Sequence, residues 1–310
     1  MATNQGFKSL LPHIDKVDAG YLSHWLSAKL DYLQNLGSGA TFKEISTEVV
    51  ARIQIPLPSL DVQRQIAEVL DSADRLCTLR RETLSRLKSV VKSIFVDTFG
   101  NLHAGSDSKS VLLHDAYWFQ EGPGVRKWQF RDTGVKLLNV ANILKDGVLD
   151  LSKTNKYLGL AEVESRYRHF LVDEGDLVVA SSGISFDDDG MLRTRGAFVE
   201  ANHLPLCMNT STIRFKAMEG LSTLAYLKQW LETVEFRSQI SRRVTGSAQQ
   251  NFGPSHLREL WITLPPIHDQ QLFDARIARV EYVRSAQQTH LAHLDALFVS
   301  LQDRAFKGKL

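Results

Sequence analysis

Apolar residues between positions 61 and 99 recur in alternating steps of four and three, with one polar interruption at Arg80. The apolar positions are Ile66, Leu70, Ala73, Cys77, Leu84, Leu87, Val91 and Ile94. This spacing is typical of the a/d seam of a coiled-coil helix rather than of an ordinary surface helix. Pro56 and Pro58 prevent a helix before it, and Gly100 can end it. The pattern therefore predicts one long helix over residues 61–99, which needs a partner to cover its seam.

The same pattern returns 207 residues later along the chain. The helix-start motif at 57–63, LPSLDVQ, becomes LPPIHDQ at 264–270, and the seam positions recur as Phe273, Ile277, Val280, Arg284, Gln287, Leu291, Leu294, Phe298 and Leu301. Seven of these nine are apolar, and chance does not explain a match of both the helix-start motif and the seam. The sequence predicts a duplication and a second long helix over 267–306. An antiparallel pair of the two helices is the natural arrangement, although the seam alone leaves a parallel pair open.

The duplication extends upstream of the helix-start motifs. Tyr21 and Trp25 recur as Tyr226 and Trp230, so the residues from about 17 to 99 correspond to those from about 222 to 306. Residues 102–220 have no earlier counterpart. The first copy is therefore expected to be shortened at its front.

The segment between the helices has the pattern of a mixed α/β domain. Alternating or β-branched stretches predict strands within 136–144, 176–183 and 208–217, and helical periodicity covers 160–171 and 221–243. In the first copy, residues 21–36 predict a helix, and 44–54 predict a short turn followed by a strand.

The expected fold class is α+β, with one mixed α/β domain and two long helices that pair as an antiparallel coiled coil. The expected domains are a partial domain at 1–58, the first long helix at 59–101, an intact mixed domain at 102–264, and the second long helix with a tail at 265–310.

Composition narrows the choice of function. At 310 residues the chain has room for two domains with proper cores, and a net charge of +2 does not make it a polycation. Any nucleic-acid binding must therefore come from local patches. Two cysteines, Cys77 and Cys207, do not form a disulfide framework, which fits a reducing cytoplasm. No apolar run reaches membrane-spanning length, and the opening residues lack the pattern of a signal peptide.

Catalytic motifs are not found in the sequence. It has no phosphate-binding loop ending in Lys-Ser/Thr, no Asn/Asp-Pro-Pro-aromatic tetrapeptide of amino-methyltransferases and no G-x-S-x-G elbow. The acidic run 187–189 and the pair His290 and His293 could bind a cation, but a solvated turn and a solvated helix face are favoured. We therefore expect no metal site and no enzymatic activity.

Several polar stretches of the middle domain have the composition of a surface that reads nucleic acid. An open Gly/Pro loop precedes two cations, and Gln and Asn are the side chains that bond adenine bidentately. Each stretch also has a plain structural interpretation as a turn, a cap or a polar loop, and the choice stays open. The candidate DNA-binding residues in these stretches are Arg126, Lys127, Asn139, Asn142, Arg193, Arg195, Arg242, Arg243, Gln249, Gln250 and Asn251.

These features together resemble the specificity subunit of type I restriction–modification systems. The resemblance rests on the repeated helix-start motif, on the C-terminal tail SLQDRAFKGKL, and on KLLNVANI, GDLVVASSG and GSAQQNF in that family's order for one target-recognition domain. It covers most of residues 17–310. Ser181 and Ser182, in the second of those three stretches, complete the set of candidate DNA-binding residues.

The resemblance implies a role. Such subunits carry two target-recognition domains, each followed by a helix, and each domain reads one half of a split sequence in double-stranded DNA. The helices, here 61–99 and 267–306, space the domains and dock modification subunits, which bind S-adenosylmethionine and methylate adenine. Restriction subunits join for cleavage. This chain would itself be non-catalytic and carry no cofactor.

The sequence departs from the family pattern at its front. Residues 1–58 match only the last part of a first recognition domain. Either the subunit is a half-type one, which could homodimerise to restore two recognition domains, or the remaining part is on another polypeptide. The alternative function is a protein-interaction scaffold, or a degenerate reader that does not bind DNA, built on the coiled coil.

Overall fold

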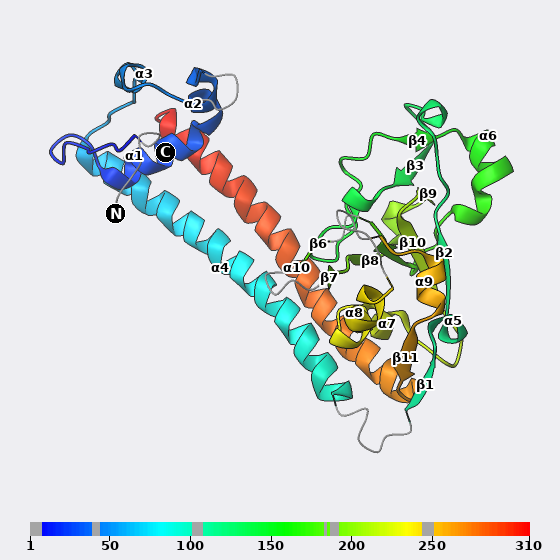
Figure 1. The fold of residues 1–310 in the computed structure, drawn as a ribbon. Coiled ribbons are helices and arrows are strands. Elements are labelled where there is room, and N and C mark those ends of the chain that lie inside the picture. Colours follow the sequence, from blue (N-terminus) through cyan, green and yellow to red (C-terminus); the bar gives the residue numbers. More distant parts are fainter. Residues whose placement is uncertain (1–7, 39–43, 101–107, 183–184, 187–191, 244–250) are drawn as a thin grey trace. The chain divides into compact units, whose positions relative to one another are not determined.

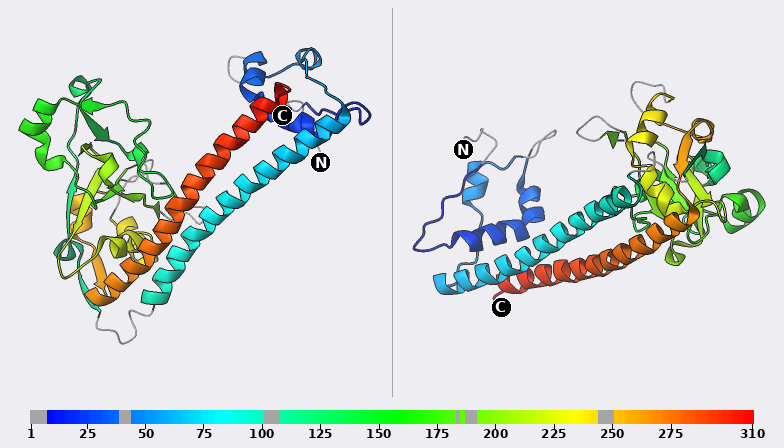
Figure 2. Two further views of the ribbon diagram at one scale, coloured as in Figure 1. Left: turned by 180° about the vertical axis from the view of Figure 1, so that it is seen from behind. Right: turned by 90° about the horizontal axis from the view of Figure 1, so that it is seen from below.

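In the computed structural model the described residues are 8–38, 44–100, 108–182, 185–186, 192–243 and 251–310. The chain divides into two compact units: unit 1 comprises Met1–Ser89 and Val280–Leu310, and unit 2 comprises Val90–Arg279. The two long helices predicted from the seam are present as α4 (Leu60–Phe99) and α10 (Ile267–Phe306), and each contributes residues to both units. They lie side by side in Figures 1 and 2.

Within unit 1 the two helices run antiparallel. Ile66 and Leu70, early in α4, pack in one apolar cluster with Leu301 and Ala305, late in α10. Further along α4, Arg81 contacts Asp295 at 2.6 Å, so the contact partners on α10 move back as α4 advances. The predicted α+β fold class, with an antiparallel coiled coil, is confirmed.

The polar interruption of the first seam meets one of the two polar positions of the second seam. Arg80 and Gln287 occupy equivalent positions in the two copies, and the guanidinium of Arg80 donates a hydrogen bond to Oε1 of Gln287. Both side chains are half-buried. A polar pair inside an apolar seam lowers stability but favours one register, because a slipped helix would face each polar group with an apolar one.

The remaining helices of unit 1 are α1 (Ala19–Ala28), α2 (Leu30–Leu36) and α3 (Thr47–Ala51). The single helix predicted over 21–36 is therefore wrong, because the chain breaks at Lys29 between α1 and α2. The strand predicted within 44–54 is also wrong. Ser46 caps α3 by accepting a hydrogen bond from the N–H of Val49, and residues 53–59, all of them described, form no strand.

A buried glutamine closes the first copy around the start of α4. Gln63 is fully buried; its Nε2 donates to the carbonyl oxygens of Lys16 (3.0 Å) and Pro58 (2.8 Å). Its Oε1 accepts from the N–H of Asp18 at 2.9 Å. One side chain thus joins three backbone groups on both sides of α1, and we call this arrangement the first clamp.

A tyrosine completes the first clamp. The hydroxyl of Tyr21 donates to the carbonyl of Pro56 at 2.8 Å, and its ring packs edge-on against Phe306, at the end of α10, with centroids 5.5 Å apart. The first copy is therefore tied to both long helices within unit 1.

Unit 2 contains the strands and most of the short helices. Its largest sheet has the order β2-β10-β5-β8, beside a three-stranded sheet β4-β3-β9 and the pairs β1-β11 and β6-β7. The strands are β1 (Lys109–Leu112), β2 (Tyr117–Glu121), β3 (Val135–Leu138), β4 (Tyr157–Leu158), β5 (Leu177–Ala180), β6 (Ser185–Phe186), β7 (Leu192–Arg193), β8 (Gly196–Phe198), β9 (Leu206–Met208), β10 (Thr212–Ala217) and β11 (Trp261–Leu264).

Alternation along the strands divides the core of unit 2 into layers. Val179 of β5 and Phe215 of β10 face a cluster that includes helix residues Trp230 and Phe236, whereas Val178 faces a second cluster with β8 and β9. The helices and turns are α5 (Leu113–Ala116), α6 (Leu160–Glu162), α7 (Leu224–Trp230), α8 (Val234–Ser241), α9 (Pro254–Arg258), η1 (Lys127–Gln129), η2 (Val140–Asn142), the π-helical η3 (Val163–Tyr167), η4 (Arg168–Phe170) and η5 (Ala201–His203).

Two predicted elements of unit 2 are shorter than expected. The strand predicted over 136–144 ends at Leu138, where η2 begins. The helix predicted over 221–243 is two helices, α7 and α8, because Thr233 caps α8 by accepting from the N–H of Phe236. In both places a short polar side chain competes with continuation of the element.

The second copy closes on an equivalent clamp. Gln270, fully buried, donates from Nε2 to the carbonyls of Leu221 (3.2 Å) and Pro265 (2.8 Å), and its Oε1 accepts from the N–H of Thr223 at 2.9 Å. Tyr226 donates to the carbonyl of Thr263. These partners occupy the same positions in the repeat as those of the first clamp, so the duplication is preserved bond by bond.

Candidate nucleic-acid interface

The loops at one end of the main sheet of unit 2 come together through backbone hydrogen bonds. The N–H of Gly122, just after β2, donates to Thr212 at the start of β10 (2.9 Å). Ser181, just after β5, donates to Ser211 (2.9 Å) and accepts from Phe252 (3.0 Å). Four segments far apart in the sequence therefore lie side by side, and we call this region the sheet end.

Several predicted DNA-binding residues lie at the sheet end. Ser181 is buried, Ser182 is half-buried and Asn251 is exposed. Arg195 approaches the same strand, because its carbonyl accepts from the N–H of Ala180 at 2.9 Å. Gln249 and Gln250, predicted as base-reading amides, lie outside the described residues.

The sheet end leaves no room beside Gly122. A Cβ at this glycine would lie 2.2 Å from the carbonyl oxygen of Asn209, so only glycine lets the two backbones approach this closely. Ser211, in the same turn, has a φ of 67°, in the left-handed region. This local geometry fixes where the chain enters the loop 122–126.

Asn139 and Asn142 are engaged within the fold. Asn142 is buried; its Oδ1 accepts from the N–H of Asn139, and its Nδ2 donates to Asp150 (2.8 Å) and Thr154 (2.7 Å). Asn139 Oδ1 accepts from Asn209 Nδ2 at 2.9 Å. Asn142 thus closes the turn η2 with its side chain, whereas the side chain of Asn139 bonds Leu137 and Asn209 and makes no cap.

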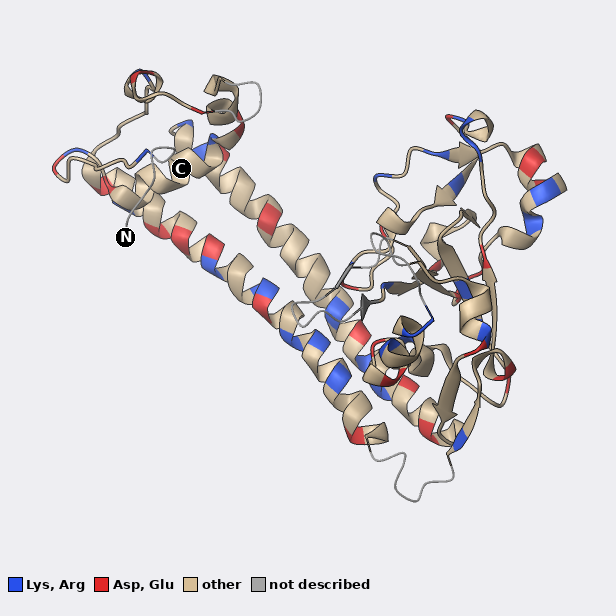
Figure 3. Cartoon of the chain, in the orientation of Figure 1, with Lys and Arg blue, Asp and Glu red and all other residues tan. Residues whose placement is uncertain are grey.

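A basic segment follows the sheet end. Residues 122–159 contain seven Lys and Arg against three Asp, which makes this stretch more positive than a chain of net charge +2 would suggest. Figure 3 shows these cations around β3 and β4. Arg126, Lys127 and Arg131 are exposed, as are Lys153 and Lys156. Such a patch supplies the sequence-independent attraction to phosphate that nucleic-acid binding requires.

The other predicted cations lie elsewhere in unit 2. Arg242 is exposed at the end of α8, whereas Arg243 contacts Glu259 (3.2 Å) and the carbonyl of Gln239 (2.9 Å). Arg193 lies in the short strand β7, and its side chain lies outside the described part of the chain. The structure thus brings Ser181, Ser182, Arg195 and Asn251 together and leaves Arg242 and Arg243 on a separate helix end.

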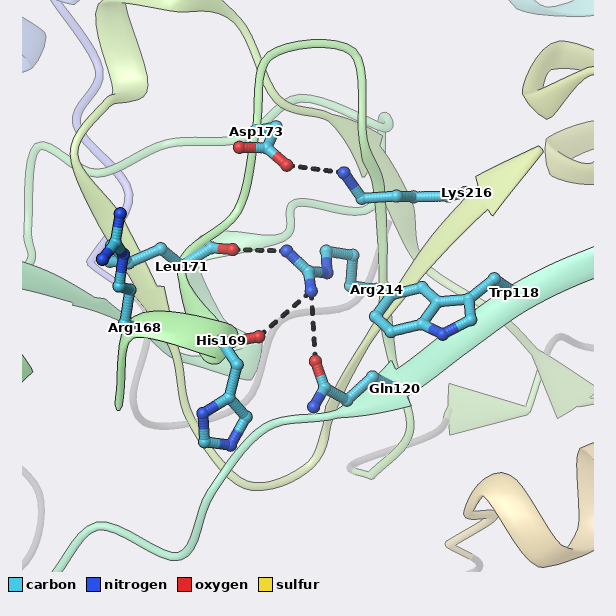
Figure 4. A pocket seen from close by; sticks show the side chains of 8 residues that line it. All are labelled: Trp118, Gln120, Arg168, His169, Leu171, Asp173, Arg214 and Lys216. Carbon is cyan, nitrogen blue, oxygen red and sulfur yellow. Dashed lines mark hydrogen bonds and ion pairs between the residues drawn. The ribbon is translucent and has the colours of Figure 1, made fainter. Parts of the chain in front are cut away.

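A pocket of about 430 Å³ opens beside β2 and β10, and Figure 4 shows its lining. Arg214, in its centre, is buried and donates to the carbonyls of Leu171 and His169 (3.1 Å) and to Gln120 (3.1 Å). Its guanidinium lies 4.8 Å from the ring centroid of Trp118. These hydrogen bonds link the segment around η4 to β2 and β10.

An ion pair lies at the edge of this pocket. Nζ of Lys216 contacts Asp173 at 2.5 Å and Asp176 at 3.3 Å. The hydrogen bond between Lys216 and Asp173 lowers the pKa of Asp173 and raises the pKa of Lys216. Elsewhere in unit 2, burial raises the pKa of Cys207 to about 12, so its thiol is protonated at neutral pH.

Sequence reasoning missed Asn209, Ser211 and the exposed cations Arg131, Lys153 and Lys156. Asn209 and Ser211 were hidden in a stretch predicted as a strand, and only their hydrogen bonds place them at the sheet end. Among the described residues, no group of three or more His, Cys, Asp and Glu is placed to hold a metal ion. No helix in the described part of the chain has the length and apolarity needed to cross a membrane.

The fold thus defines an α+β protein in which a mixed domain is joined to a long antiparallel helix pair, and comparison with known proteins identifies its relatives. Residues 1–89 match the family model of the type I restriction modification DNA specificity domain. The chain is 23% identical over 224 residues to the specificity subunit of the type I restriction enzyme MjaIX of Methanocaldococcus jannaschii, covering 66% of this chain and 51% of that subunit. It is 21% identical over 307 residues to the MjaVIII specificity subunit of the same organism, covering 95% and 71%.

Two solved structures share the fold. One, from a study of complex assembly and conformational transition of the type I R-M system, matches with a TM-score of 0.54 at 16% identity and covers 96% of this chain and 73% of that one. The type I S subunit from M. genitalium matches with a TM-score of 0.53 at 13% identity, covering 96% and 74%. The resemblance drawn from the repeat is confirmed: the chain is a relative of the specificity subunits of type I restriction–modification systems. It spans about half the length of the MjaIX subunit.

Proposed function

We propose that the chain is the sequence-specific DNA recognition subunit of a type I restriction–modification complex, which directs modification and restriction subunits to a split target site. The observation that carries the proposal is the repeated clamp, which joins the start of each long helix to the preceding copy of the repeat, in a chain similar to specificity subunits. The sheet end and the basic segment of unit 2 supply the polar and positive surface that DNA binding needs.

The proposal assigns no chemistry to the chain itself. It is a non-catalytic subunit without a cofactor, and S-adenosylmethionine belongs to the modification subunit that methylates the target adenine. A cytoplasmic location belongs to the same proposal, because the complex acts on DNA inside the cell.

An exposed stripe on α4 supports docking of a helical partner. Val62, Val69 and Leu76 recur every seven residues and are 39%, 38% and 53% exposed, so they lie beside the seam and outside it. Apolar side chains at heptad spacing favour the packing of a further helix along a coiled coil. We assign this stripe to the modification subunits.

The first copy of the repeat exposes apolar surface at a position that is buried in the second copy. Leu57 is 54% exposed and Tyr32, the third residue of α2, is 47% exposed. The equivalent of Leu57, Leu264, is buried in the core of unit 2. In unit 2 the strand that contains Leu264 pairs with β1, which belongs to the segment without a counterpart in the first copy. We assign this exposed surface to a contact with a second polypeptide, which a homodimer would supply.

Selection from a random DNA library tests the recognition role. The purified chain, in complex with its modification subunits, is mixed with random duplexes at moderate salt, and bound DNA is sequenced. We expect an enriched split motif and an affinity that falls with salt. Absence of both an enriched motif and a salt dependence would refute the proposal and favour the alternative of a scaffold or a degenerate reader.

Variants separate phosphate contacts from base contacts. Arg126→Ala or Lys127→Ala should weaken binding across all sequences, whereas Gln250→Ala should relax the preference at one base position. Uniform weakening by the Gln250 change would refute its assignment as a base reader while leaving the DNA-binding role intact.

A further inference from the structure

Trp128 is the most exposed of the five tryptophans, with 69% of its surface accessible. It lies in the 3₁₀ turn η1, between Lys127 and Gln129. An indole combines a large apolar ring with one N–H donor, and tryptophan is enriched at contact surfaces for this reason.

The turn that carries Trp128 is anchored on its inner side. Gln129 is buried; its Nε2 donates to Glu162 (2.6 Å) and to the hydroxyl of Tyr167 (2.7 Å), while its Oε1 accepts from the N–H of Arg126 at 2.8 Å. The turn is therefore held by three hydrogen bonds of one buried side chain. Such a support presents the neighbouring indole in a defined position.

The outer side of the turn is anchored as well. Arg131 donates from its guanidinium to the carbonyls of Trp128 (3.0 Å) and Phe130 (3.0 Å), and its own N–H donates to Tyr157 at 2.9 Å. Trp128 is thus a projecting aromatic side chain on a turn fixed from both sides.

The charges around the indole point to nucleic acid rather than protein. Arg126, Lys127 and Arg131 are all exposed and lie within three residues of Trp128, in the segment with seven cations against three carboxylates. Protein contact surfaces centred on tryptophan are depleted of lysine, whereas aromatic side chains among cations are typical of nucleic-acid contacts.

We infer that Trp128 is a wedge that packs its indole against an unstacked base step of the target duplex, while Arg126 and Lys127 hold the flanking phosphates. The inference rests on the proposed function and adds to it a residue that reads deformability rather than base edges. Side chains that enter a base step part the stacked bases and kink the duplex, at a cost that depends on the sequence of the step. Trp128 would therefore contribute specificity at a position where no hydrogen bond to a base is made.

The test uses the chain in complex with its modification subunits and the duplex enriched from the random library. Trp128→Ala should lower affinity for this duplex roughly tenfold without changing the salt slope, because a stacking contact releases no counterions. Trp128→Phe, which keeps an aromatic ring, should retain most of the affinity. Lys127→Ala is the matched comparison, and it should reduce the salt slope.

A fluorescent base locates the contact. 2-Aminopurine, placed in turn at each position of the enriched duplex, should brighten at one step when the wild-type complex binds and stay dim with Trp128→Ala. Trp261→Phe, a change at another exposed tryptophan on β11, is the control and should leave the signal unchanged.

Each other outcome overturns the inference in a different way. Wild-type affinity and wild-type fluorescence for Trp128→Ala would show that the indole does not enter the duplex, although DNA recognition would stand. Loss of the modification subunits from Trp128→Ala in gel filtration without DNA would make the turn a protein contact. Failure to enrich any duplex would instead remove the proposed function on which the wedge depends.

Discussion

Replacing the buried glutamine of the second clamp should loosen unit 2 and leave unit 1 unchanged. Gln270→Ala removes a side chain that bonds three backbone groups: the N–H of Thr223 and the carbonyls of Leu221 and Pro265. Alanine is a good helix former, so the substitution does not harm α10 as a helix. The loss is therefore confined to the clamp.

The magnitude follows from the groups left behind. A buried polar group without a partner costs about 1–3 kcal/mol. The carbonyl of Pro265 belongs to a buried residue and would lose its partner, whereas Leu221 is exposed, so water can reach the surroundings of its carbonyl. We expect unit 2 to lose about 3 kcal/mol of unfolding free energy, which corresponds to a roughly hundredfold increase in its open fraction.

The two cysteines report the two units separately. Cys207 lies in the core of unit 2 and Cys77 in the helix seam of unit 1, and both are buried. Burial raises the pKa of each thiol, so at pH 8 alkylation requires that the surrounding structure opens. The measurement is the rate at which iodoacetamide modifies each cysteine of the native protein, read by mass spectrometry.

The twin clamp provides the matched variant. Gln270→Ala should accelerate alkylation of Cys207 roughly a hundredfold and leave Cys77 near its wild-type rate, while Gln63→Ala should do the reverse. Gln271→Ala, at an exposed neighbouring position, is the control and should change neither rate. Acceleration of Cys207 by less than threefold in Gln270→Ala would refute the reasoning, as would equal acceleration of both thiols by either clamp variant.

Three further predictions concern the seam, the sheet end and pH. Replacing Arg80 and Gln287 together by leucine should raise the unfolding free energy of the helix pair by about 1–3 kcal/mol and slow the alkylation of Cys77. Either leucine substitution alone should destabilise the helix pair. A double variant less stable than both single variants would contradict this prediction. Gly122→Ala should weaken DNA binding at least tenfold and destabilise unit 2 by about 1–3 kcal/mol, because the added Cβ would collide with the backbone of Asn209. Gly124→Ala is the control, and it should change neither DNA binding nor stability, because the space around Gly124 is open. Since the pKa of Asp173 is lowered from 3.8, its contribution to stability is present above pH 3.8 and is lost as pH falls through the folded-state pKa; urea unfolding across that range should show a smaller acid-dependent loss for Asp173→Asn.

The elements predicted best from the sequence were those with a long and regular pattern. The coiled-coil seam runs along two helices of forty residues each, so a few polar interruptions do not obscure the pattern. The strand predicted within 44–54 failed for a different reason. Only the end of this stretch, at residue 54, corresponds to β11 of the second copy, which pairs with β1, and a strand needs such a partner to satisfy its backbone groups. Local pattern cannot report whether a partner is present.

The candidate site was predicted in part. Exposed Arg126 and Lys127 follow from their position in an open Gly/Pro loop, and the structure places them on an anchored turn. Asn142 has the residue type of a base reader, but its amide bonds Asp150 and Thr154, eight and twelve residues further along. Residue type gives what a side chain can bind, and only the fold decides what it does bind.

The two clamps also show which groups attach each copy of the repeat to its long helix. All three partners of Gln63 lie within residues 16–58, so this clamp closes on groups that the first copy itself supplies. Tyr21 likewise bonds Pro56, although its ring packs against α10. Leu57, in contrast, is exposed, whereas its equivalent Leu264 is buried in the strand pair β1-β11. Attachment of the first copy to the long helices therefore rests on residues of the first copy and of the helices themselves.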